Sequence, residues 1–165
     1  MGMLSFIKEA GEKLFGKGPA QAAMTAAQAD PSSAEKQKAA NDAAADAILA
    51  YIEAQGLKAT GLTVTFDGST ATVYGVADDQ ATKEKIVLCA GNVQGVGAVN
   101  DQMTVDVSTT EAQYYTVVKG DNLSKIAKQY YGDPNKYPKI FEANKPMLKS
   151  PDLIYPGQML RIPPQ

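Results

Sequence analysis

Residues 91–99 read Gly-Asn-Val-Gln-Gly-Val-Gly-Ala-Val, with three glycines in seven residues and no charged side chain. The residues before this stretch, 85–90, are typical of the end of a helix, and residues 99–107 are typical of a strand. A glycine-rich turn between a helix and a strand brings backbone groups close together, because no side chains separate them. Taken alone, the stretch is a helix C-cap followed by a tight loop. A second hypothesis is a cluster of neutral carbonyl oxygens, and the rest of the chain must decide between the two.

The segments before and after this loop predict a small α+β domain over residues 35–107. A helix is expected from Ser33, its N-cap, to about Gln55. Residues 62–66 and 71–76 then alternate between apolar and polar around Asp67-Gly68, which is typical of a β-hairpin. Either Asp78 or Asp79 can cap the next helix, residues 80–90, and residues 99–107 supply a third strand. The order α-β-β-α-β predicts helices on one face of a three-stranded sheet.

A second unit is predicted for residues 114–165, after a polar linker at 108–113. A strand at 114–118 precedes two stretches with apolar residues at helical spacing, 123–130 and 137–144. Prolines and a Pro-Gly pair then lead to a final strand at 159–162. We expect a β-α-α-β arrangement in which the two strands pair.

The N-terminal residues 1–15 predict a short amphipathic helix, with Leu4, Ile7 and Leu14 on one face and charged residues opposite. Such a helix is too short to be stable alone, so it must dock on another part of the protein. Residues 16–34 are rich in Ala and Gln, and we expect a flexible connector in which residues 21–28 can be transiently helical.

The composition excludes several functions for this chain of 165 residues. Its net charge is −2, so no basic excess favours nucleic acid or an anionic membrane. It has no histidine and a single cysteine, Cys89, which removes His-dependent catalytic triads, disulfides and cysteine-based zinc clusters. We expect Cys89 to be a buried apolar residue. No secretory signal is visible, and we expect a cytoplasmic, non-enzymatic, monomeric protein that binds neither nucleic acid nor membrane.

The second unit resembles a LysM domain. The family's opening pattern, Tyr-x-Val-x-x-Gly-Asp-x-Leu-x-x-Ile-Ala, is matched by residues 115–127, and its closing Asn, Pro-Gly and strand are matched by Asn144, Pro156-Gly157 and residues 160–162. The first unit resembles a BON domain through its hairpin, its second helix and the loop Gly91-Asn92-Val93 that leads to residues 97–99.

The two domains together, after a segment that reads Met-Gly-x-x-x-Phe-x-Lys-x-Ala-Gly-Glu-Lys-Leu, resemble the small bacterial potassium-binding proteins of BON–LysM type. The resemblance covers nearly the whole chain except residues 16–38. It implies reversible K⁺ binding, with the two domains and the N-terminal segment compacting around the ion.

The chemistry of K⁺ fits this composition. Proteins commonly dehydrate this large ion with neutral backbone carbonyls, whereas carboxylate clusters favour Ca²⁺ and Mg²⁺. The end of the N-terminal helix and the glycine loop are both expected to leave carbonyls unpaired. The resemblance points to the same two places, and the carbonyl oxygens that it assigns to the ion are those of Ile7, Ala10, Gly11, Gly91, Val93 and Val96.

Two other functions stay open at this stage. LysM domains often hold N-acetylglucosamine polymers, and the resemblance places that groove at Gly120, Asp121, Asn122, Leu123, Ile154, Tyr155 and Pro156. The second alternative is a structural adaptor, in which the LysM surface docks an unknown protein partner.

Overall fold

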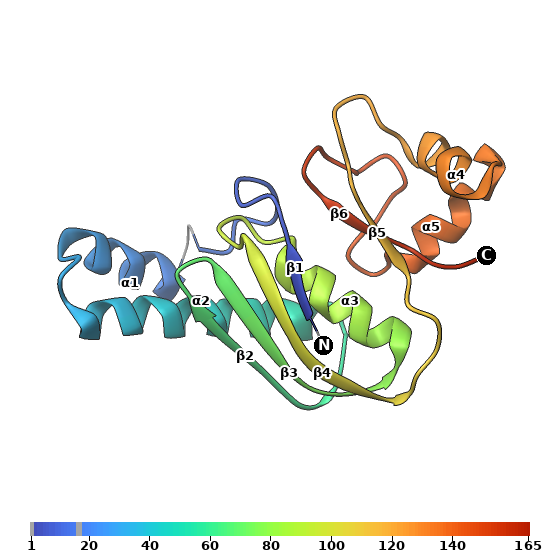
Figure 1. The fold of residues 1–165 in the computed structure, drawn as a ribbon. Helices are drawn as coiled ribbons and strands as arrows, with labels where there is room; N and C mark the ends of the chain where they lie inside the picture. The colour runs from blue at the N-terminus through green and yellow to red at the C-terminus, as the bar shows by residue number, and fades with distance from the viewer. Residues whose placement is uncertain (1, 16–17) are drawn as a thin grey trace.

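The computed structural model in Figure 1 describes residues 2–15 and 18–165, and its first domain is built on one mixed sheet. The strands are β1 (Gly2–Ser5), β2 (Thr60–Asp67), β3 (Thr70–Asp79) and β4 (Ala98–Val107), in the spatial order β1-β4-β3-β2. The hairpin partners β2 and β3 are antiparallel, and β3 and β4 are parallel. The predicted hairpin and third strand are confirmed, and β1 adds a fourth strand that the sequence did not predict.

Two helices, α2 (Ala34–Ala54) and α3 (Gln80–Gly91), cover one face of this sheet (Figure 1). Both begin where the sequence predicts. The Ser33 hydroxyl accepts from the Lys36 N–H, and the Asp79 carboxylate accepts from the Thr82 N–H at 2.7 Å. This backbone hydrogen bond lowers the pKa of Asp79. Between helices and sheet lies a core of fully buried apolar side chains, which includes those of Ile48, Ile52, Val73, Ile86, Leu88 and Val99.

The second domain has the predicted β-α-α-β order. It consists of β5 (Gln113–Thr116), α4 (Leu123–Tyr131), the short 3₁₀ turn η1 (Pro134–Lys136), α5 (Tyr137–Ala143) and β6 (Met159–Ile162). Strands β5 and β6 pair antiparallel. The buried side chain of Asn144 ties α5 to β6, because its Nδ2 donates to the carbonyl oxygens of Ile140 and Arg161 and its Oδ1 accepts from the Arg161 N–H at 2.7 Å.

The predicted N-terminal helix is wrong. Residues 2–5 form β1, which pairs antiparallel with β4 in the register Gly2↔Asp101 to Ser5↔Ala98. Residues 6–15 form turns and irregular backbone. The edge of β4 presents unpaired N–H and C=O groups, and pairing with them outweighs the weak propensity of a short isolated helix. The expected apolar stripe is also not buried as a unit, since Ile7 is 46% exposed while its neighbour Phe6 is buried.

The predicted flexible connector is partly wrong. Residues 18–29 form helix α1 (Gly18–Ala29), which lies along α2 (Figure 1). Ala20 and Ala27 are buried, and the Gln37 side chain donates to the Ala27 carbonyl at 3.2 Å. A composition rich in Ala and Gln is typical of a linker, but these residues also form a helix readily once they have a surface to pack on. Residues 16 and 17 lie outside the described residues. None of the described helices has the length and apolar character needed to cross a membrane.

Candidate functional site

The N-terminal segment, defined here as residues 6–15, lies directly against the glycine loop, residues 91–97. Four backbone hydrogen bonds join them. Phe6 N–H donates to the Gly97 carbonyl, Glu12 N–H to that of Asn92, Gln94 N–H to that of Glu12, and Gly95 N–H to that of Lys8, at 2.7–2.9 Å. The structure therefore brings together the two stretches that the sequence predicts to share an ion, although the first of them is not a helix.

Two glycines allow this close approach. Gly11 has a φ of +112°, and a Cβ on it would lie 2.5 Å from the Asn92 carbonyl oxygen. A Cβ on Gly91 would lie 2.0–2.3 Å from three ring atoms of Phe6, whose side chain is buried over the end of α3. At both positions, only hydrogen leaves room for the opposite segment.

The six carbonyls assigned from the resemblance differ in their hydrogen bonds. The Ile7 carbonyl accepts from the Ala10 N–H at 3.2 Å, and the Val93 carbonyl from the Val96 N–H at 3.0 Å. Within residues 2–15 and 18–165, no donor is paired with the carbonyl oxygens of Ala10, Gly11, Gly91 and Val96. Each carbonyl oxygen has two lone pairs, so all six retain the capacity to accept a further ligand.

The second domain also contacts the place where the N-terminal segment and the glycine loop meet, which is called the junction here. The Asn92 side chain donates from Nδ2 to the Met159 carbonyl at 2.8 Å and accepts from the Met159 N–H at 2.9 Å. Gly157, just before β6, lies so close to the N-terminal segment that a Cβ there would be 2.6 Å from that of Ala10. These contacts are not predictable from the sequence, because nothing local in it relates residue 92 to residue 159.

A buried charge cluster also joins the two domains. Glu84 on α3 pairs with Arg161 on β6 at 2.8 Å, and the other Glu84 oxygen accepts from the Ala112 N–H in the linker and from Gln80. Glu84 and Arg161 are only 3% and 8% exposed. This pair has no local signal in the sequence, because its members are 77 residues apart.

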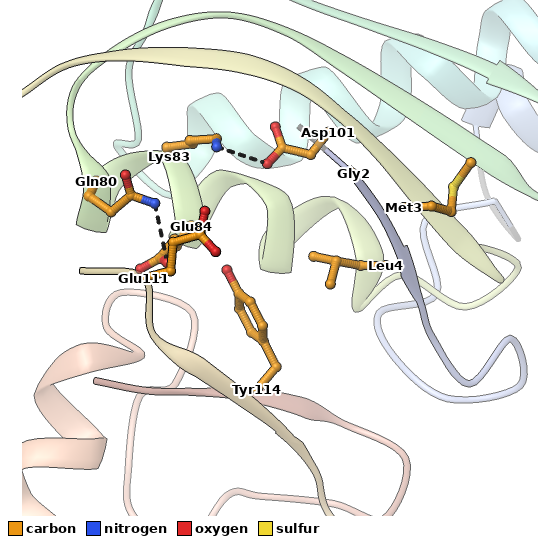
Figure 2. Close-up of a pocket in the computed structure, with 9 residues that line it drawn as sticks. All are labelled: Gly2, Met3, Leu4, Gln80, Lys83, Glu84, Asp101, Glu111 and Tyr114. Carbon is orange, nitrogen blue, oxygen red and sulfur yellow. Dashed lines mark hydrogen bonds and ion pairs between the residues drawn. The ribbon is translucent and has the colours of Figure 1, made fainter. Parts of the chain in front are cut away.

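The Glu84 cluster opens into a small cavity that lies against β1 (Figure 2). Lys83 and Asp101 form a second ion pair there at 3.2 Å. Figure 2 shows the hydroxyl of Tyr114, from β5, pointing toward the side of the cavity where Glu84 and Glu111 lie. Burial and then the negative charge of Glu84 raise the pKa of Tyr114, so this hydroxyl remains protonated at neutral pH.

Cys89 lines a second cavity, of about 250 Å³, between the two domains and the N-terminal segment, together with Glu12, Tyr51 and Tyr155. Its side chain is 1% exposed, which confirms the predicted buried position. Burial, and next the charge of Glu12, raise the pKa of the Cys89 thiol to about 12; the same two causes raise the pKa of Tyr155 to about 12.

Cys89 should therefore react very slowly with thiol reagents while the domains are docked. A pKa near 12 in place of 9.0 lowers the thiolate fraction at pH 8 by about 10³-fold, and only the thiolate reacts. We expect labelling by iodoacetamide at pH 8 to be at least about 100-fold slower in the folded protein than in urea. Equal rates in the two conditions would show that the cavity between the domains is open.

Three of the seven residues of the expected glycan groove have structural roles in the second domain. The Asp121 carboxylate accepts from the Tyr115 hydroxyl and the Val118 N–H, and Asn122 caps α4 by accepting from the Lys125 N–H at 2.8 Å. Leu123 is buried in the core of the domain, and Tyr155 lines the cavity shared with the first domain. Gly120, Ile154 and Pro156 are exposed or half-buried.

Carboxylates and thiols do not gather around a common point in the described part of the chain. Across residues 2–15 and 18–165, no group of three or more Asp, Glu, Cys or His side chains is placed to hold a metal ion. The oxygen atoms that the junction offers to an ion are those of its backbone carbonyl groups.

Comparison with known proteins identifies a BON domain at residues 40–107 and a LysM domain at residues 115–163, which confirms both predicted families. The chain is 42% identical over 164 residues to a protein of Escherichia coli named "Potassium binding protein Kbp", and the match covers 99% of each chain. It is also 36% identical over 131 residues to an uncharacterized protein of Deinococcus radiodurans, covering 72% of this chain and 51% of that one. The chain therefore belongs to the BON–LysM family that includes the Escherichia coli potassium binding protein.

Proposed function

We propose that this protein binds K⁺ reversibly, and that backbone carbonyls of the N-terminal segment and the glycine loop share one ion. The observation that carries the proposal is the junction itself: two segments about 80 residues apart in sequence are held together, and four of the six assigned carbonyl oxygens have no described hydrogen-bond donor. The name of the Escherichia coli relative supports the choice of ion.

The assigned ligands are the carbonyl oxygens of Ile7, Ala10, Gly11, Gly91, Val93 and Val96. Neutral carbonyl dipoles replace the hydration shell of K⁺ without the strong field that favours small divalent ions. Because the ligands are backbone atoms, most side-chain substitutions act through the conformation of the two segments rather than by removing a ligand.

The ion shifts a conformational equilibrium in this proposal. Opening separates the N-terminal segment from the glycine loop, and closing returns both sets of carbonyls to one place. The ion favours the closed form only to the extent that it binds this form more tightly than the open one. The protein thus acts as a cytoplasmic K⁺ binder or sensor that becomes more compact on binding, without catalysing a reaction.

Calorimetric titration tests the proposal. At constant ionic strength, KCl should give saturable heat with a stoichiometry of one, and NaCl should give only heat of dilution. Small-angle scattering on the same samples should show a smaller radius of gyration with K⁺. Binding heat from chitooligosaccharides and not from K⁺ would support glycan binding by the LysM domain instead. If neither ligand gives binding heat, the structural-adaptor function is favoured.

A further inference from the structure

We propose that Asn92 couples occupancy of the K⁺ site to docking of the LysM domain. This inference rests on the proposed K⁺ function and adds a positioning residue to it. Asn92 stands between Gly91 and Val93, two of the assigned carbonyl ligands, and its side chain forms two hydrogen bonds with β6 of the LysM domain.

Every polar group of Asn92 has a partner, and the partners come from three parts of the molecule. Its N–H donates to the Leu88 carbonyl at the end of α3, and its carbonyl accepts from the Glu12 N–H in the N-terminal segment, each at 2.9 Å. Its side-chain amide makes the two hydrogen bonds with Met159. This single residue therefore links the BON helix, the N-terminal segment and the LysM domain.

Asparagine is well suited to this position. Its side-chain amide carries one acceptor and one donor group, as a backbone peptide does, so it satisfies both polar groups of Met159 at once. Aspartate has no donor and would face the Met159 carbonyl with a negative charge, while alanine would leave both Met159 groups without these partners. When β6 moves away, the Asn92 side chain loses both bonds, and the loop backbone on either side loses the part of its support that comes from the LysM domain.

A second, separate contact between the same two domains allows the coupling to be measured. The Glu84–Arg161 ion pair also joins α3 to β6. Glu84 stands eight residues before Asn92, which is about 12 Å along the helix. Replacing both charges by Glu84→Gln with Arg161→Gln should weaken LysM docking, because it removes this ion pair. The two substitutions lie outside the glycine loop, and changing both partners leaves neither charge of the pair buried alone.

The experiment is a calorimetric K⁺ titration of the full chain and of variants that are shown to be folded by circular dichroism. Asn92→Ala should lower K⁺ affinity about tenfold, the result of losing two hydrogen bonds at the junction. Asn41→Ala is the matched control, because the Asn41 side chain accepts from the Gly68 N–H at 3.3 Å within the BON domain, away from both the proposed site and the LysM domain. The K⁺ affinity of this variant should stay within about twofold of that of the unaltered protein, since two sites without shared partners act independently.

A double-mutant cycle separates coupling from local loop support. The Glu84→Gln, Arg161→Gln change should lower K⁺ affinity several-fold when Asn92 is present and much less in the Asn92→Ala background. An equal fold-change in both backgrounds, or an Asn92→Ala affinity within twofold of the unaltered protein, would overturn the coupling while leaving K⁺ binding intact. Absence of K⁺ heat from the unaltered protein would instead overturn the proposed function, and this inference with it. If Asn92→Ala does not fold, Asn92→Asp keeps an acceptor for the Met159 N–H and serves in the same cycle.

Discussion

Replacing Gly11 by valine should lower K⁺ affinity about 100-fold or abolish binding. Gly11 has a φ of +112°, where a β-branched residue is strained by about 1–3 kcal/mol, and its Cβ would lie 2.5 Å from the Asn92 carbonyl oxygen and 2.9 Å from the Val93 nitrogen. These are backbone atoms, so no side-chain rotation relieves the clash. The N-terminal segment must lift off the glycine loop, which separates the two proposed halves of the site.

Two controls make the Gly11 result specific. Lys8→Ala changes an exposed side chain of the same segment and leaves its backbone carbonyl bonded to the Gly95 N–H, so affinity should be unchanged. Gly120→Ala introduces strain at a similar φ of +92° in the LysM domain, where a Cβ meets nothing within 4 Å. K⁺ affinity that survives Gly11→Val, or falls as far in Gly120→Ala, would contradict a site between residues 6–15 and 91–97.

Replacing Gly91 by alanine should also weaken K⁺ binding, by about 10- to 100-fold. The added methyl group would occupy the place of the Phe6 ring, at 2.0–2.3 Å from three of its atoms. Overpacking of a buried contact typically costs about 1–3 kcal/mol, and here the cost falls on the closed form, because Phe6 can leave its place when the N-terminal segment undocks. Calorimetry gives the affinity, and the radius of gyration should stay large at K⁺ concentrations that compact the unaltered protein.

Gly97→Ala is the matched control for Gly91→Ala in the same loop. A Cβ on Gly97 would make an ordinary contact at 3.7 Å with the Ser69 hydroxyl oxygen, and its φ is outside the region reserved for glycine. K⁺ affinity should therefore change little. Equal losses in the two variants would mean that the loop tolerates no side chain for reasons unrelated to Phe6.

The regular elements of both domains were predictable from the sequence because their signals are local. The alternation on either side of Asp67-Gly68 and the caps at Ser33 and Asp79 each depend on residues within a few positions of one another. The BON and LysM motifs place these elements in the right order, so the α+β class and the pairing of β5 with β6 follow.

The N-terminal segment was not predictable in the same way. Leu4, Ile7 and Leu14 stand at helical spacing, but the competing structure, β1 on the edge of β4, depends on a strand about 95 residues away. The tertiary pairing satisfies backbone groups that a short helix leaves free at both ends. For the same reason the Ala- and Gln-rich residues 18–29 gave a linker signal, although α2 offers them a packing surface.

The candidate site was predicted in part. Residues 6–15 and 91–97 do lie together, which follows from the glycine pattern and the family resemblance. The family resemblance implies that both domains compact around the ion, but the contacts that join the LysM domain to the junction are not predictable, because Asn92–Met159 and Glu84–Arg161 pair residues 67 and 77 positions apart. Through these contacts the LysM domain packs directly against the junction, so it is not merely tethered to it by the linker.

The most direct test of the account is the position of the ion itself. Crystals of the full chain grown in KCl, with diffraction recorded near the potassium absorption edge, should show one strong anomalous peak between the N-terminal segment and the glycine loop. The account predicts that carbonyl oxygens from both segments, drawn from Ile7, Ala10, Gly11, Gly91, Val93 and Val96, coordinate this ion, and that the peak is lost when NaCl replaces KCl. A peak at carboxylates elsewhere, a peak held by one segment alone, or no peak at saturating K⁺ would contradict it.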